Sequence, residues 1–182
     1  MRKVLVTAPT FSPLEVEEIK VRPELRISGS DDDIVLSAYI KAAVNAYEKF
    51  SGRILCASTW DLYFDEFSDQ FETPAPLSSV TSITYTDTSS VEQTVTSTDY
   101  VVDTTNQVEG RIVLAYGSSW PTSVLSQINT VKVRVVVGYA SVADIPEEIL
   151  TGLILKIQEL YDGTDRSSAY ESCWIADARL SV

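Results

Sequence analysis

The chain has 182 residues, 45% of them hydrophobic, which is enough for a core of ordinary size and excludes disorder throughout. Its 14 basic and 26 acidic residues give a formal net charge of −12, which excludes a chain that grips nucleic-acid phosphates through clustered lysine and arginine. No apolar run approaches the roughly 20 residues of a membrane span, and the apolar stretch at the start is too short for a secretory signal. We therefore expect a soluble protein, made in the cytoplasm and without a membrane partner.

Two helices are predicted in the N-terminal part. The first, about 13–22, begins with a capping box that opens at Ser12. The second, about 31–51, has Ser30 as its N-cap and three aspartates in its first turn, where negative charge is favoured. Gly52 ends this helix, because glycine readily takes the left-handed conformation of a C-cap.

The long helix is apolar around most of its circumference. Leu36, Ile40, Ala43 and Tyr47 recur at three- and four-residue steps and share one face. Such a helix buries more than the usual surface helix and needs neighbours on two sides, either helices of its own chain or other copies of the chain. For contact between copies, the candidate residues are Val35, Tyr39, Lys41, Ala42, Ala46 and Glu48.

Between residues 54 and 139 the apolar period changes to two, which predicts five to seven short, mainly antiparallel strands. Trp60, Leu62 and Phe64 alternate with Asp61 and Asp65, so we expect these two carboxylates on the solvent side of their strand. The predicted strands are about 59–65, 79–86 in a hairpin with 91–95, 100–103 paired with 111–116, and 131–135.

A third main helix is predicted for about 146–161, and Gly163 stops it. Residues 164–182 are expected to form an extended C-terminal tail for partner docking. Aromatic residues and arginine dominate the energetically important positions of interfaces, and the tail carries both. The alternative is that its aromatic residues fold back onto the chain's own core. The candidate docking residues are Tyr170, Trp174, Ile175, Arg179 and Leu180.

The residues that the chain contains do not favour a catalytic function. The chain has no histidine, which removes the commonest general base and zinc ligand. Cys56 and Cys173 lack a metal-binding spacing and are expected to be reduced, mostly buried thiols. Asp61, Asp65 and Glu66 on an aromatic strand suggest the carboxylate pair of a glycosidase, but their expected exposure favours solvated side chains. We therefore expect no enzyme, no catalytic or metal site and no cofactor.

Together these patterns predict an α+β fold, with a small core of three main helices, an inserted antiparallel β-region and an extended C-terminal tail. Residues 1–163 are expected to form a single domain, followed by the tail at 164–182.

The order of short motifs along the chain resembles the head-tail connector (adaptor) proteins of long-tailed bacteriophages, roughly from Leu14 to Tyr161. In the N-terminal part the motifs are Leu25-Arg26-Ile27, Asp31-Asp32-Asp33, Ala43, Ala46 and Tyr47 ahead of Gly52-Arg53, and Thr59-Trp60-Asp61-Leu62. Further on they are Pro74-Ala75-Pro76-Leu77-Ser78-Ser79-Val80, Ile83-Thr84-Tyr85, Asp99-Tyr100-Val101-Val102-Asp103, Gly110-Arg111-Ile112, Trp120-Pro121, Val131-Lys132-Val133, Gly138-Tyr139 and Ile145-Pro146.

The resemblance implies a structural virion protein at the head-tail junction. Such connectors form a ring, commonly of twelve copies, between the portal of the capsid and a tail-side neck or stopper protein, and their C-terminal segment typically reaches the portal. DNA passes through the ring without specific binding, which agrees with an acidic chain. Two alternatives remain, another neck or tail-completion virion protein and an acidic β-rich binding module.

Overall fold

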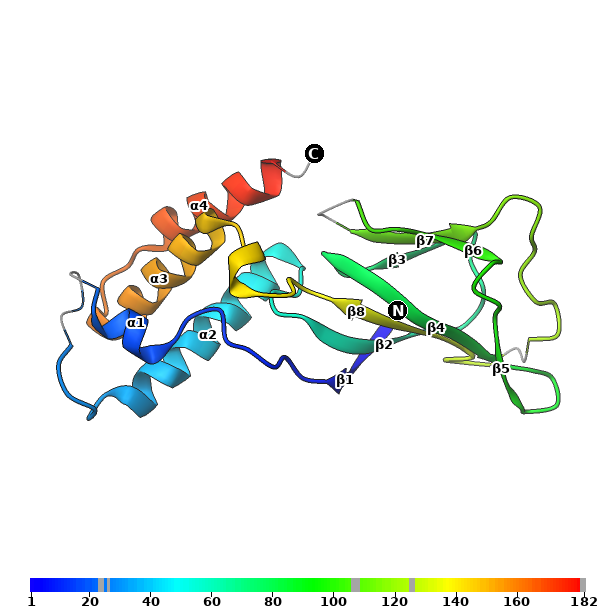
Figure 1. Cartoon of the computed structure of the whole chain (residues 1–182), viewed down its shortest axis with the longest axis horizontal. Helices are drawn as coiled ribbons and strands as arrows, with labels where there is room; N and C mark the ends of the chain where they lie inside the picture. The colour runs from blue at the N-terminus through cyan, green and yellow to red at the C-terminus, as the bar shows by residue number, and fades with distance from the viewer. Residues whose placement is uncertain (23–24, 26, 106–108, 125–126, 181–182) are drawn as a thin grey trace. The chain divides into compact units, whose positions relative to one another are not determined.

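The computed structural model describes residues 1–22, 25, 27–105, 109–124 and 127–180, with side chains up to Ile175. Arg26 and the side chains of Arg179 and Leu180, named above, lie outside this description. The chain divides into a β unit, residues 1–10 with 57–138, and a helical unit, residues 11–56 with 139–182. The β-region is thus inserted between the two halves of the helical unit, and the predicted α+β fold is confirmed (Figure 1).

The β unit contains a five-stranded and a three-stranded antiparallel sheet. The first has the order β1-β2-β8-β4-β5 and the second the order β3-β7-β6 (Figure 1). The predicted pairings of β4 with β5 and of β6 with β7 are confirmed. The strands are β1 (Arg2–Thr7), β2 (Ser58–Phe64), β3 (Gln70–Thr73), β4 (Leu77–Thr86), β5 (Glu92–Thr94), β6 (Tyr100–Asp103), β7 (Gly110–Leu114) and β8 (Val131–Val137).

The core of the β unit follows the alternation of its strands. On β8, Val131, Val133, Val135 and Val137 are fully buried while the residues between them are half-buried. The two sheets meet through aromatic side chains, since the rings of Phe64 and Phe71 lie 4.7 Å apart. Alternating apolar residues therefore account for the packing of this unit.

The helical unit contains α1 (Val16–Lys20), α2 (Asp33–Ser51), the short 3-10 helix η1 (Val142–Asp144), α3 (Glu147–Asp162) and α4 (Ser167–Leu180). In its core the buried side of α2, predicted from the sequence, packs against α3, in which Ile149, Leu153 and Ile157 are fully buried. Gly52 and Gly163 end α2 and α3 in the left-handed conformation, with φ of 73° and 71°. None of the helices in the described ranges is long and apolar enough to cross a membrane.

The helix starts differ from the prediction. The first helix is shorter than 13–22, because the Ser12 hydroxyl donates to the Leu14 carbonyl at 2.7 Å instead of capping. Glu15 takes the N-cap position, and its backbone N–H donates to the Glu18 carboxylate at 3.1 Å. In the long helix Asp32, not Ser30, is the N-cap residue, so the helix begins two residues later than expected.

The segment expected to be an extended tail is largely a helix, α4, which lies beside α3 (Figure 1). Asp165 precedes it and accepts the N–H of Ser167 at 2.9 Å. Tyr170, Cys173 and Trp174 follow at helical spacing and are buried or half-buried. Because these apolar side chains have a core to enter, the segment is ordered as a fourth helix.

Candidate functional site

The helix α2 presents an outer face opposite to its buried one. Leu36, Ile40, Ala43 and Tyr47 face the core, and the residues that project on the other side are exposed. Ile34 is 85% and Val35 42% exposed. We define the α2 face as Ile34, Val35, Ala38, Lys41, Ala42, Asn45 and Lys49. Large exposed apolar side chains grouped on one face are typical of contact sites.

Three of the six residues predicted for contact between copies, Val35, Lys41 and Ala42, are exposed on the α2 face. Tyr39 and Ala46 instead pack, half-buried, against the core of the helical unit. The sixth residue, Glu48, points back into its own unit, where its carboxylate accepts the Leu55 N–H at 3.0 Å.

Four members of the α2 face, Ile34, Ala38, Asn45 and Lys49, were missed in the sequence. Positions 34, 38, 41, 45 and 49 follow one another at three- and four-residue steps opposite to the core residues. That spacing is the signal that would have revealed them.

Two of the predicted docking residues of the C-terminal segment lie in the core. Trp174 is 2% exposed, and its ring lies 4.8 Å from Tyr170, 5.5 Å from Phe50 and 5.7 Å from Tyr47. The alternative stated for these aromatic residues, folding back onto the chain's own core, is what the structure shows for Tyr170 and Trp174. Ile175 is 39% exposed on the outer side of α4.

Polar contacts also hold α4 against α3. The Lys156 ammonium forms an ion pair with Glu159 and donates to the Tyr170 hydroxyl at 3.3 Å. Burial alone would lower the pKa of Lys156, but the hydrogen bonds to Glu159 and Tyr170 outweigh it and raise that pKa. Glu159 also accepts the backbone N–H of Arg166, the residue just before α4, at 2.8 Å. These contacts position the start of α4 against the end of α3.

In the β unit the structure corrects the expected exposure of Asp61. It is only 6% exposed, because β2 pairs with β8 so that Asp61 lies opposite Arg134. Its two carboxylate oxygens accept from the Arg134 guanidinium at 2.7 Å and 2.8 Å. The hydrogen bond to Arg134 lowers the pKa of Asp61, although burial acts in the opposite direction. A glycosidase needs one carboxyl group with a raised pKa as general acid, so this ion pair is structural.

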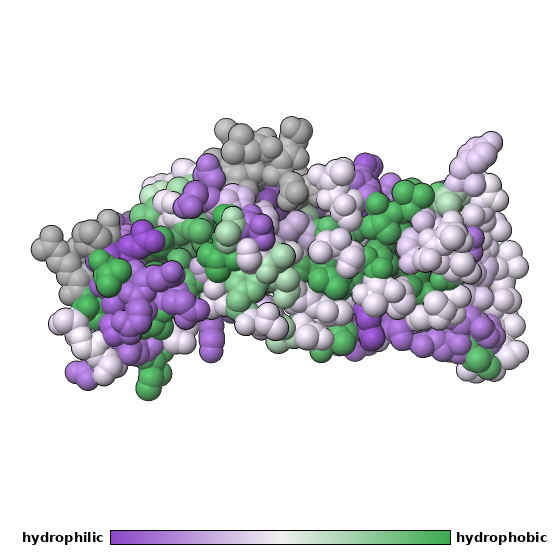
Figure 2. All heavy atoms as spheres, viewed as in Figure 1, coloured by the Kyte–Doolittle hydropathy of each residue, from purple (hydrophilic) through white to green (hydrophobic). Residues whose placement is uncertain are grey.

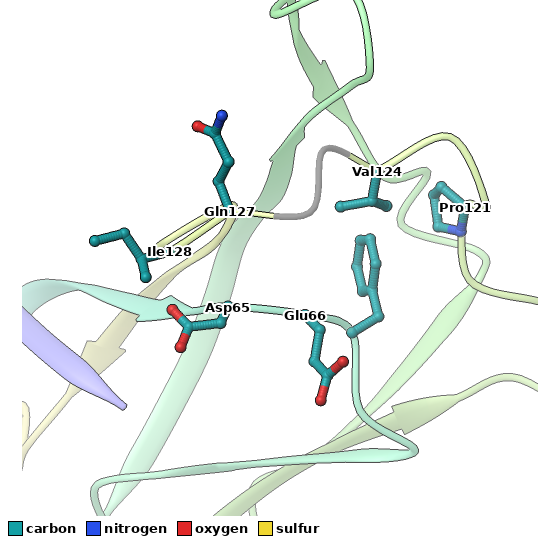
Figure 3. A pocket seen from close by; sticks show the side chains of 7 residues that line it. Asp65, Glu66, Pro121, Val124, Gln127 and Ile128 are labelled. Atoms are coloured by element: carbon teal, nitrogen blue, oxygen red, sulfur yellow. The ribbon is translucent and has the colours of Figure 1, made fainter.

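Asp65 and Glu66 follow β2 and line an open pocket of 590 Å³ together with Val124 and Ile128 (Figure 3). Asp65 accepts the backbone N–H of Asn129 at 2.8 Å, which fixes the loop that leads into β8. In Figure 3 the two carboxylates point in different directions and do not converge on one point. Their arrangement supports a loop contact and not a catalytic pair.

The described residues hold no group of three or more side chains able to bind a metal ion. Cys56 is buried and Cys173 half-buried, and the two form no disulfide with each other. Burial raises the pKa of Cys56 to about 11, with a smaller contribution from Glu48, so its thiol stays protonated at neutral pH.

The surface features are of the kind that binds other protein chains. Figure 2 shows hydrophobic side chains reaching the surface between hydrophilic ones. The α2 face, with Ile34 and Val35 exposed, is the candidate contact surface of the helical unit.

Comparison with known proteins gives the family. Residues 15–131 match the model of the phage gp6-like head-tail connector proteins, and the chain belongs to this family. It is thus a structural protein of the virion neck, at the head-tail junction, and not an enzyme.

Solved structures agree on the fold. The chain resembles, with 22% identity and a TM-score of 0.74, a chain in the neck of an empty gene transfer agent (GTA) particle computed with C6 symmetry. It also resembles a chain in the virion of a native GTA particle, with 21% identity and a TM-score of 0.76. A third similar chain, with 18% identity and a TM-score of 0.69, lies in the neck of a native GTA particle computed with C12 symmetry. Each match covers 97% of this chain and 94% of the other. No curated protein matches.

Proposed function

We propose that this connector forms a homo-oligomeric ring of twelve copies in the virion neck. The ring binds the portal protein on one side and a tail-side neck or stopper protein on the other. DNA passes through it without being bound specifically. The observation that carries the proposal is the exposed α2 face, because a lone subunit would leave Ile34 and Val35 in water.

The solved neck structures support a ring as well. One similar chain belongs to a neck computed with C12 symmetry and another to a neck computed with C6 symmetry. Closed rings need an interface that repeats from copy to copy, and an apolar helix face at every subunit supplies one half of it.

Light scattering on the purified chain measures the assembly. Ala42→Arg places a charged, bulky side chain on the α2 face and is expected to reduce the assembly to smaller species. Ser89→Arg adds the same side chain at an exposed position of the β4–β5 turn, and it serves as the matched control that keeps the assembly. If both variants assemble equally well, the α2 face is not part of the contact between copies.

Portal binding is assigned to the outer side of α4 and to the end of the chain. Ile175 is exposed there, and Arg179 and Leu180 follow it. Tyr170 and Trp174 take part by holding α4 in place from within the core. Truncation after Gly163 would remove this core packing too, so a point substitution is the cleaner test.

The portal-binding test compares two variants of α4. Ile175→Asp is expected to weaken co-purification with the portal protein by at least tenfold. Ala169→Asp, an exposed position about a third of a turn away around the helix, is the control and should bind normally. If the first variant binds the portal as well as the control does, the docking surface lies elsewhere, which would favour a position further along the neck or tail.

The acidic charge supports free passage of DNA. Each copy carries a formal charge of −12, and like charges repel phosphate over roughly 8 Å at physiological salt. The assembled ring is therefore expected not to retain duplex DNA in a mobility-shift assay, even at low salt. Retention at physiological salt would contradict the proposed passage.

A further inference from the structure

A second surface of the helical unit is shaped to receive a side chain. Between α1 and α3 lies a groove of 210 Å³ whose lining is mainly polar, with Leu14, Leu150 and Ile154 among its apolar members. Small-molecule sites usually enclose about 300–1,000 Å³, so this groove suits one or two side chains from another protein. Val142, 39% exposed, also lines it.

The charge around the groove is mainly acidic. Glu18 and Glu147 line it, and Glu148, exposed beside Glu147, adds a third carboxylate in the same region. Arg22 is the basic residue of the lining, which leaves an excess of negative charge. A segment that combines apolar and basic side chains therefore matches this groove.

The α2 face has that combination. Its apolar residues are Ile34, Val35, Ala38 and Ala42, and its charged residues are Lys41 and Lys49. Within the described part of the chain neither lysine forms an ion pair, whereas Lys20, Lys156 and Arg166 of the same unit each do. The two lysines are thus available to carboxylates of another molecule.

We propose that the α2 face of one copy lies against the α1–α3 groove of the next copy and inserts one or two of its side chains there. This inference rests on the proposed ring and names the two surfaces that form its repeating contact. A ring needs such a heterologous interface, in which two different patches meet. A contact of the α2 face with itself would bring lysines together at an apolar surface, which is unfavourable.

Charge reversal tests the pairing. Lys41→Glu alone and Glu147→Lys alone are each expected to raise the dissociation constant of the assembly at least tenfold, and the double variant should recover most of the loss. Lys3→Glu changes the net charge as Lys41→Glu does, but on strand β1, and should assemble normally. Circular dichroism of each variant checks that the fold is kept.

The possible results distinguish a failure of this pairing from a failure of the proposed ring. A wild-type chain that stays monomeric, alone and with the portal protein, would contradict the ring itself. A wild-type ring whose assembly ignores both reversals, or whose double variant shows no recovery, would overturn the pairing and leave the ring intact.

A cross-link gives a measurement that does not depend on charge. With Ala38→Cys and Val142→Cys in the same chain, and with Cys173→Ser to remove the half-buried native thiol, oxidation of the assembly is expected to produce a ladder of linked chains on denaturing gels. Either substitution alone should give no ladder. A ladder missing from the double variant of an intact ring would place the groove outside the interface.

Discussion

The two units of this connector fill their cores in different ways. In the β unit the core residues come from many strands, and β8 alone contributes the fully buried Val131, Val133, Val135 and Val137. In the helical unit Trp174, from the last helix, contacts three other aromatic rings and fills the space beside Gly152. The helical unit therefore depends on Trp174, which lies in the segment proposed above to bind the portal.

Removal of the indole ring is expected to have the largest effect. Trp174→Ala should lower the free energy of unfolding by about 3–5 kcal/mol, because it leaves a large cavity in the helical core. Ile175→Ala, one residue later and exposed, should change it by no more than about 0.5 kcal/mol. Urea unfolding measures both, and similar losses in the two variants would contradict the central position of Trp174.

Crowding at the same place should have the next largest effect. A Cβ at Gly152 would overlap the indole of Trp174, so Gly152→Ala is expected to cost about 1–3 kcal/mol by overpacking. In a Trp174→Ala background the indole atoms that meet this Cβ are gone, and the same substitution should cost less. A double-mutant cycle in urea measures the difference, and equal costs in both backgrounds would show that the two residues do not interact.

In the β unit the ion pair of Asp61 predicts a pH dependence. Arg134 holds the pKa of Asp61 below its ordinary value, so the pair stabilises the fold above about pH 4 and loses this effect as pH falls through the lowered pKa. Asp61→Asn should cost about 1–3 kcal/mol at pH 7, less if solvent screens the half-exposed Arg134. The difference between wild type and variant should shrink towards pH 2. If the difference in the free energy of unfolding stays constant from pH 7 to pH 2, the ion pair with Arg134 is not what stabilises the fold through Asp61.

The smallest effect concerns the two thiols. With a pKa of about 11, only about one Cys56 side chain in a thousand is a thiolate at pH 8, against roughly a quarter for an ordinary thiol. In a Cys173→Ser variant the remaining thiol is therefore expected to react slowly with a thiol reagent until the protein unfolds. Cys56→Ser leaves the half-buried Cys173 as the faster-reacting comparison. Equal rates would contradict the buried state of Cys56.

Local patterns predicted much of the fold and failed where a segment depends on distant partners. The strands β2, β4 and β8 follow alternating apolar residues, and Gly52 and Gly163 end their helices as expected. β1 was not among the predicted strands, since its apolar residues Val4, Leu5 and Val6 are consecutive and all of its residues are exposed, so its sequence carries no alternation. β3 has four residues, of which only Phe71 and Thr73 are buried, so its alternation is too short to stand out.

The candidate sites were likewise predictable only where a local pattern determines them, and not where a distant partner does. Among the residues predicted on α2 for contact between copies, Val35, Lys41 and Ala42 are exposed. The burial of Trp174 needed the position of α4 against α3, and the pairing of Asp61 with Arg134 needed the register of β2 and β8. These contacts join residues far apart in the chain, so no local pattern contains them.

The mass of the purified chain in solution, alone and mixed with the portal protein, tests the central claim most directly. A ring predicts an assembly of about twelve chains of 20.1 kDa each in at least one of the two samples. A 20.1 kDa monomer in both samples would contradict the ring and, with it, the proposed role of the α2 face.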